Sequence, residues 1–129
     1  FQGNTGPFIQ YTHARISAIL RKAVEMNCNS SLGTNYNSYL LNETEVEVIE
    51  TLVKFPEVIK EAAANYSPAV IANYVYDIAK TYNRFYAECS IFKEEDENKV
   101  ALRVELSTQV AKVIKKGMYL LGAVVPEKM

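Results

Sequence analysis

Three side chains near the start of the chain, Phe8, Tyr11 and Arg15, have the types and spacing that single-stranded nucleic acid favours. Aromatic rings stack on unpaired bases, and a guanidinium contacts a phosphate or stacks on a base. On a helix of about 100° per residue, Tyr11 and Arg15 lie roughly 140° and 100° from Ile16, the centre of the apolar stripe. The opening helix is therefore predicted to have an aromatic and basic side as well as an aliphatic one.

The same three side chains also fit a plain packing role. The two rings can face a neighbouring helix, and Arg15 can pair with a carboxylate. A net charge of −1 and a pI of about 5.9 give the whole chain no basic footprint, so any nucleic-acid contact must depend on local charge. The local basic groups are Arg15, Arg21 and Lys22 on the first predicted helix and Lys112, Lys115 and Lys116 on the last.

Helices must position these residues, because apolar side chains recur at helical spacing and no segment shows sustained strand alternation. We predict a single all-α domain over residues 1–129, folded as an antiparallel bundle of about five helices. The apolar stripe of the first helix consists of Ile9, Thr12, Ile16, Ile19, Leu20 and Ala23.

Capping residues and a proline predict the boundaries in the first half of the chain. Thr5 is predicted to cap the first helix, which ends near Asn27 ahead of a loop rich in Asn, Ser and Gly. Asn42 or Thr44 caps the next helical segment, whose acidic first turn suits the helix dipole. Pro56 is expected to break or kink that segment, because it lacks a backbone N–H.

Similar signals mark the second half. Ser67 and Pro68 are predicted to cap and open a long helix. The last helix is expected to run from about Asn98 to Leu121, with Gly122 as its stop. The apolar stripe of the long helix consists of Ile71, Val75, Ile78, Tyr82 and Phe85, flanked by Tyr74 and Tyr86.

Few residues have the types that catalysis or metal binding needs. Cys28 and Cys89 lack ligand spacing, so we expect no metal site and two free thiols in a reducing compartment. His13 has no nucleophile or paired acid within helical reach, which predicts a packing residue. Arg103 falls on the apolar stripe of its helix, which favours a structural salt bridge over an RNA contact. No leader and no membrane span of about 20 apolar residues is expected.

Several short motifs, in a fixed order, resemble a known family. The chain opens with "GNTGPFIQYTHAR" (residues 3–15), continues with "FPEV" and "NRFY", and closes with "GMYLLG" and "PEKM". Together they resemble the C-terminal anticodon-binding domain of arginyl-tRNA synthetases, called the DALR domain, over essentially the whole chain. The "ALR" helix also fits, although Val100 departs from the acidic residue that precedes it in the family.

The resemblance implies a helical bundle that grips the anticodon loop of tRNA(Arg). The partner catalytic domain, which attaches arginine to the tRNA with ATP and Mg, has no counterpart among the motifs of this chain. We therefore expect no catalytic residue, metal or cofactor in the chain itself. A cytoplasmic monomer is the expected form.

Carried over residue by residue, the resemblance implies RNA contacts at five positions. Phe8 stands where the family has tyrosine, so it keeps the stacking face and loses the hydroxyl. Tyr11 and Arg15 match the family pattern directly. Tyr82 lies in the middle of an apolar stripe, so its contact requires the ring to project past the packed part of the helix. Met129 is expected to pack near a splayed-out base.

A helical docking module without an RNA role is the alternative from another class. It would bury the same aromatic face against another protein or against a catalytic domain. The same module attached to a different synthetase, such as the cysteine enzyme, fits the opening motif and the "PEKM" end less well.

Overall fold

The computed structural model describes residues 5–26, 41–93 and 96–122, and within these residues the chain forms five helices and no strand. No helix among them is long and apolar enough to cross a membrane. The all-α prediction with about five helices is confirmed. The helices are α1 (Thr5–Glu25), α2 (Glu43–Val53), α3 (Phe55–Asn65), α4 (Pro68–Glu88) and α5 (Glu97–Leu120).

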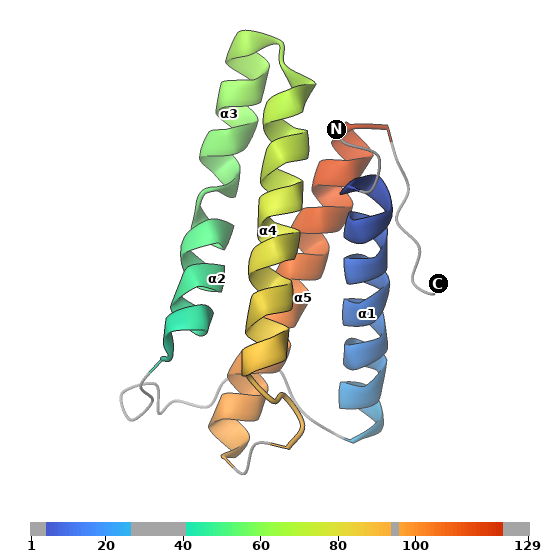
Figure 1. Ribbon diagram of the computed structural model, residues 1–129, viewed down its shortest axis with the longest axis vertical. Coiled ribbons are helices and arrows are strands. Elements are labelled where there is room, and N and C mark those ends of the chain that lie inside the picture. Colours follow the sequence, from blue (N-terminus) through green and yellow to red (C-terminus); the bar gives the residue numbers. More distant parts are fainter. Residues whose placement is uncertain (1–4, 27–40, 94–95, 123–129) are drawn as a thin grey trace.

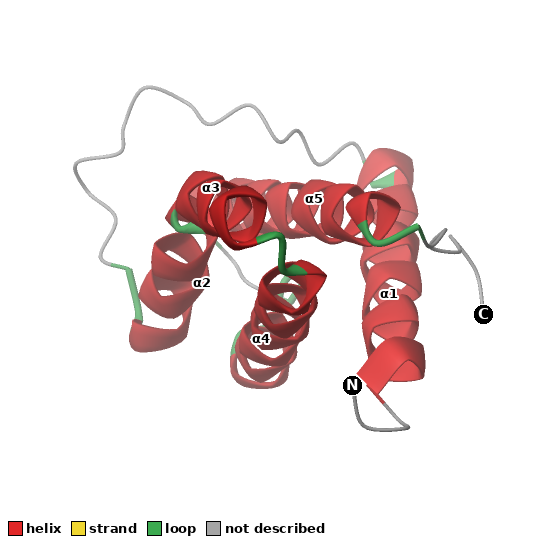
Figure 2. Ribbon diagram, turned by 90° about the horizontal axis from the view of Figure 1, so that it is seen from above, coloured by secondary structure: helices red, strands yellow, loops and turns green. Residues whose placement is uncertain are grey.

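The helix α5 passes behind α4 in Figure 1 and packs against three of the other helices, α1, α2 and α4. Seen from above, α1, α4 and α2 lie side by side along α5 (Figure 2), and each of them contacts it. The predicted antiparallel packing holds for α5 against α1 and α4, and for α2 and α3 against α4 (Figure 1). The two helices α1 and α4 run in the same direction, so their C-terminal ends meet at one end of the bundle.

The helix boundaries follow the predicted capping signals in the first half of the chain. The helix α1 begins at Thr5 itself, one residue earlier than predicted. Asn42 caps α2 with a capping box, in which its Oδ1 accepts from the N–H of Glu45 at 2.9 Å and the Glu45 carboxylate accepts from the N–H of Asn42 at 3.0 Å. Pro56 is followed by continuous helix, and the break falls just before it, at Lys54.

The second half has two further boundaries of the predicted kind. Ser67 precedes α4 and Pro68 is its first residue, as predicted, but the Ser67 side chain makes no capping hydrogen bond. Gly122 follows α5 with φ of 82°, in the left-handed region that glycine enters without a steric penalty. The last helix therefore ends within a residue of its predicted end.

The core lies where the predicted stripes of α1 and α4 face α5. Every residue of the α4 stripe is buried, and in the α1 stripe only Leu20 is half-buried. Close approach of α5 to α4 depends on Gly117, because a Cβ at that position would collide with Cγ2 of Val75. The largest fully buried apolar side chains are Ile9, Ile16, Val48, Val75, Ile78, Tyr82, Phe85, Val110 and Ile114.

Candidate nucleic-acid interface

The guanidinium of Arg15 lies between two tyrosine rings that face solvent. Its Cζ is 5.0 Å from the ring centroid of Tyr11, one turn earlier on α1, and 4.7 Å from that of Tyr86 on α4. Both distances are within the range of an attractive cation–π contact. Tyr11 is 51% exposed and Tyr86 is 41% exposed, so each ring keeps a surface that another planar group can cover.

Hydrogen bonds to one residue of α4 and one residue of α1 hold Arg15 in this position. Its Nη1 donates to Oδ1 of Asn83 at 2.6 Å, and its Nη2 donates to the hydroxyl of Tyr11 at 3.3 Å. The amide nitrogen of Asn83 donates in turn to Oγ1 of Thr12 and to the carbonyl of Ala79, each at 2.8 Å. Every polar atom of the Asn83 side chain is therefore engaged, which fixes the side on which it accepts from Arg15.

The partner of the Arg15 guanidinium on α4 is the side-chain amide of Asn83, which carries no charge. Among the residues that the structure describes, no carboxylate lies within ion-pair distance of its guanidinium. The alternative in which Arg15 pairs with a carboxylate therefore does not hold for these residues. A guanidinium that is oriented but not neutralised is suited to bind a phosphate, because charge-assisted hydrogen bonds to phosphate are strong.

These residues lie at one end of a groove of about 980 Å³. Its walls are the outer side of α1, the last turn of α4 and the segment 89–93 that follows it. Among the described residues, four cationic side chains and one carboxylate line the groove, in a chain with a net charge of −1. The cationic residues are Arg15, Arg21, Lys22 and Lys93, and the acidic residue is Glu88.

The structure brings together two of the predicted site residues, Tyr11 and Arg15. Phe8 is half-buried and does not line the groove; its ring packs edge-on against Tyr76, with centroids 5.7 Å apart and an interplanar angle of 63°. An RNA contact of Phe8 stays a prediction. Met129 lies outside the described residues.

The expectation that the ring of Tyr82 reaches the surface is wrong. Tyr82 is 0% exposed, and its hydroxyl shares a hydrogen bond of 2.8 Å with Ser107 on α5. Burial raises the pKa of this phenol well above its ordinary value. Helical periodicity, which placed Tyr82 in the core stripe, was the better guide here.

Tyr86 occupies the place for which Tyr82 was predicted. It follows Tyr82 by one turn of α4, about 40° further round the helix, at the edge of the apolar stripe. Its sequence position identified it only as flanking that stripe. The signal that singles it out is its distance from Arg15, which depends on how α1 packs against α4.

The remaining candidates have structural roles. Arg103 is 6% exposed and pairs with Glu45, with 3.2 Å between Nε and Oε2, so the predicted salt bridge is confirmed. His13 is buried, as expected of a packing residue. The thiol of Cys89 is free and buried, whereas Cys28 lies outside the described residues. No group of three His, Cys, Asp or Glu side chains within residues 5–26, 41–93 and 96–122 is placed to hold a metal ion.

Comparisons with known proteins identify the family of this chain. A family model described as "DALR anticodon binding domain" matches residues 9–129. The chain is 50% identical over 129 residues to the arginine–tRNA ligase of Amoebophilus asiaticus and 52% identical over 129 residues to that of Flavobacterium psychrophilum. These matches cover 100% of this chain but 22% and 20% of the two relatives, so the chain spans about a fifth of the length of the curated relatives it matches.

Solved structures give the same result. The arginyl-tRNA synthetase of Thermus thermophilus matches with a TM-score of 0.83 and 32% identity, over 100% of this chain and 22% of that one. A putative arginyl-tRNA synthetase from Campylobacter jejuni matches with a TM-score of 0.75 over 95% of this chain and 26% of that one. At 24% identity, the second likeness bears on the fold alone.

Proposed function

This chain belongs to the DALR anticodon binding domain family, and on that premise we propose that it binds the anticodon loop of an arginine tRNA in the groove beside α1. One observation carries the proposal: the guanidinium of Arg15 is held between two exposed tyrosine rings without a carboxylate partner among the described residues. Unpaired bases and phosphates are the two groups that such a cluster binds best.

The chemistry of binding follows from the cluster formed by Tyr11, Arg15 and Tyr86. Bases of the anticodon loop are unpaired, so they stack on the exposed faces of the two rings. Arg15 contacts the phosphate between them, and because Asn83 already orients the guanidinium, little side-chain entropy is lost on binding. Phe8 and Met129 belong to the proposal as further contacts, on the basis of the family resemblance.

The proposal extends to a longer protein of which this chain forms the anticodon-binding part. Its relatives are arginine–tRNA ligases, and the chain spans about a fifth of them. We place the attachment of arginine, with the ATP and Mg that it uses, in a catalytic domain outside these 129 residues. The tRNA and that domain are the proposed partners of a cytoplasmic monomer.

Replacement of Tyr11 by alanine tests the function. Loss of one stacked base is worth roughly 1 to 3 kcal/mol, so we expect Tyr11→Ala to weaken binding of an arginine tRNA transcript by about 5- to 150-fold. The melting temperature should change little, because the ring is exposed. Gel-shift titration at moderate salt measures the affinity. Tyr119→Ala is the matched control, since Tyr119 is 71% exposed on α5 and does not line the groove.

A second titration separates anticodon recognition from docking. A tRNA with a substituted anticodon should bind the unchanged protein more weakly than the arginine tRNA. Equal and very weak binding of both RNAs would overturn the proposal and favour a docking module without an RNA role. A sharp drop in melting temperature for Tyr11→Ala, with unchanged affinity, would instead identify Tyr11 as a packing residue.

A further inference from the structure

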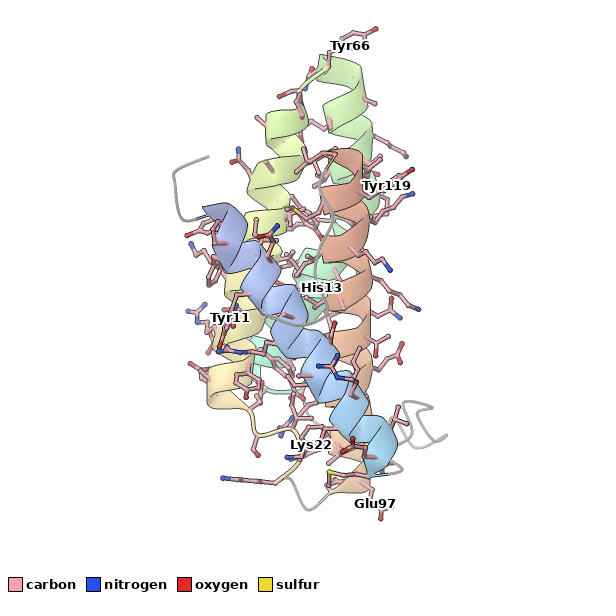
Figure 3. All side chains as sticks on the ribbon, turned by 90° about the vertical axis from the view of Figure 1, so that its right-hand side faces the viewer. Tyr11, His13, Lys22, Tyr66, Glu97 and Tyr119 are labelled. Atoms are coloured by element: carbon pink, nitrogen blue, oxygen red, sulfur yellow. The ribbon has the colours of Figure 1, made fainter. Side chains whose placement is uncertain are left out.

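A second pair of an aromatic ring and a cation lies in the same groove. The ammonium of Lys22 is 4.9 Å from the ring centroid of Phe92, and both residues line the groove. Lys22 is exposed and Phe92 is half-buried. Figure 3 shows Lys22 further along α1 than Tyr11, toward the end of the bundle where Glu97 begins α5. The proposed anticodon contacts use the cluster around Arg15 and leave this pair without a role.

The segment that carries Phe92 is held by hydrogen bonds from α5 and from the residue that caps α2. Nη1 of Arg103 donates to the carbonyl of Ser90 at 2.6 Å, and Nδ2 of Asn42 donates to Sγ of Cys89 at 2.9 Å. Ile91 is 4% exposed and packs into the core. The ring of Phe92 is therefore presented to the groove by a held segment rather than by a free loop, and a stacking surface needs that rigidity.

The spacing of the two cations suits a single strand. Lys22 follows Arg15 by seven residues, which is about 10.5 Å along the helix axis. A stacked strand advances about 3.4 Å per nucleotide, so the interval corresponds to about three stacked nucleotides, and to fewer when the strand is extended. A strand that begins at Arg15 and follows α1 thus reaches Phe92 within the length of an anticodon.

The charge of the groove favours a strand rather than an isolated base. Lys22 and Arg21 extend the positive charge of Arg15 along α1, and Lys93 adds to it from the opposite wall. A lysine ammonium is a mobile point charge, so it can leave the ring face and contact a phosphate while a base takes its place. Aliphatic residues would line the groove equally well for packing but would offer neither interaction.

We infer that Phe92 and Lys22 form a second nucleotide-binding position of the groove, at which a base stacks on Phe92 and Lys22 contacts the adjoining phosphate. This inference rests on the proposed function, because it assigns the same RNA strand a path from Arg15 to the end of α4. The binding site is then a channel for several consecutive nucleotides rather than a pocket for one base.

Titrations of the 129-residue chain with a fluorescently labelled arginine tRNA transcript test this inference by anisotropy. Phe92→Leu keeps an apolar side chain against the core and removes the ring, so the affinity should fall by about tenfold. Phe92→Trp should restore it. Lys22→Ala should lower the slope of log affinity against log salt by about 0.7, the value for one phosphate contact of a single strand.

The matched controls come from α5. The ammonium of Lys116 lies 5.5 Å from the ring centroid of Tyr119, which is the same kind of pair, and neither residue lines the groove. Figure 3 shows Tyr119 on α5. Tyr119→Leu and Lys116→Ala should leave the affinity and the salt slope unchanged. Thermal melting of every variant verifies that it is folded. If Phe92→Leu does not fold, the salt slope of Lys22→Ala tests the second position, because Lys22 is exposed and its replacement should not affect folding.

The outcomes separate this inference from the proposed function. Weakening by Tyr11→Ala, with Phe92→Leu and Lys22→Ala equal to their controls, would overturn the second position and leave the anticodon site intact. No weakening by either Tyr11→Ala or Phe92→Leu would overturn the proposed function itself. A loss that both Phe92→Leu and Phe92→Trp share, with an unchanged salt slope for Lys22→Ala, would also overturn the second position.

Discussion

The guanidinium of Arg15 lines the groove with a neutral amide as its partner, whereas that of Arg103 is buried beside a carboxylate. Arg15 has two exposed tyrosine rings around it. Arg103 donates to Glu45 and to the carbonyl of Ser90, and its side chain is 7% exposed. The same side chain thus serves two regions of one small bundle in opposite ways.

The two arginines differ in whether protein groups must offset the cost of removing their charge from water. Removing a charge from water costs several kcal/mol in practice, and the Glu45 carboxylate and the Ser90 carbonyl offset this cost for Arg103. Glu45 is itself 1% exposed and also accepts from the backbone of Asn42, so the pair ties the start of α2 to α5. Arg15 stays solvated on one side and needs no counter-charge, which leaves its charge for a ligand.

The largest effect is expected from breaking the buried pair. Arg103→Met removes the cationic partner of the buried Glu45 carboxylate, so the free energy of unfolding should fall by about 3 to 5 kcal/mol. Urea denaturation followed by circular dichroism at pH 7 measures this loss.

A substitution of Glu45 serves as the control for Arg103→Met. Glu45→Gln in the Arg103→Met background removes the buried charge and keeps an acceptor for the N–H of Asn42. The double variant should therefore be more stable than Arg103→Met alone. Equal stability of the two variants would show that lost packing, rather than an uncompensated charge, dominates.

A smaller effect on folding and a larger one on RNA binding are expected at Arg15. Charge-assisted hydrogen bonds contribute about 1.5 to 3 kcal/mol, so Arg15→Ala should weaken binding of arginine tRNA by about 10- to 150-fold. Its free energy of unfolding should fall by about 1 kcal/mol or less, because the side chain is only half-buried. Anisotropy titration and urea denaturation measure the two quantities.

Arg84 offers the matched control for Arg15. It lies on α4, is exposed, and pairs with Glu47 at 2.9 Å. Surface ion pairs of this kind contribute at most about 1 kcal/mol, so Arg84→Ala should change neither stability nor RNA affinity appreciably. If Arg84→Ala weakens RNA binding as much as Arg15→Ala does, general surface charge rather than the groove is responsible.

The smallest expected effect is a loss of stability at alkaline pH, and it arises from the buried tyrosines. Burial raises the pKa of Tyr74 from near 10 to about 12, with a further contribution from Asp77, and burial raises that of Tyr82 as well. Because unfolded tyrosines lose their protons near pH 10 while these two keep theirs, stability is full below about pH 10 and falls above it. Urea denaturation between about pH 9 and 11 should show this decline.

Replacement of Tyr74 tests the origin of that decline. The hydroxyl of Tyr74 donates to the carbonyl of Thr51 at 2.5 Å, a bond that ionisation removes. Tyr74→Phe should be less stable at neutral pH and should lose stability less steeply as the pH rises. An unchanged steepness would mean that other groups cause the alkaline loss.

Much of the fold could be predicted from local signals. Asn42, Pro56, Pro68 and Gly122 mark helix boundaries because each acts on its own backbone or on the adjacent turn. The resemblance of the motifs to the DALR domain is confirmed by the family match. The candidate site was predicted less completely, because Tyr11 and Arg15 were identified whereas Tyr86 and Asn83 were not.

Tyr82 shows where carrying over a family contact fails and local periodicity succeeds. The apolar spacing on α4 placed its ring in the core, and the structure agrees. The family resemblance favoured a surface contact near this position, and a ring that does reach the groove, Tyr86, lies one turn later. A shift of four residues leaves a side chain on nearly the same side of a helix, so the motif alone does not separate the two.

The sequence by itself determined the helices, their apolar stripes, and the placement of Tyr11 and Arg15 away from the stripe of α1, because these depend on a repeat of 3.6 residues within one segment. Only the tertiary structure decided that Tyr86 and Asn83 meet Arg15, and that Glu45 meets Arg103. The physical reason is that a helical repeat fixes directions around one axis, whereas contacts between helices depend on how the axes are placed by packing of the whole core.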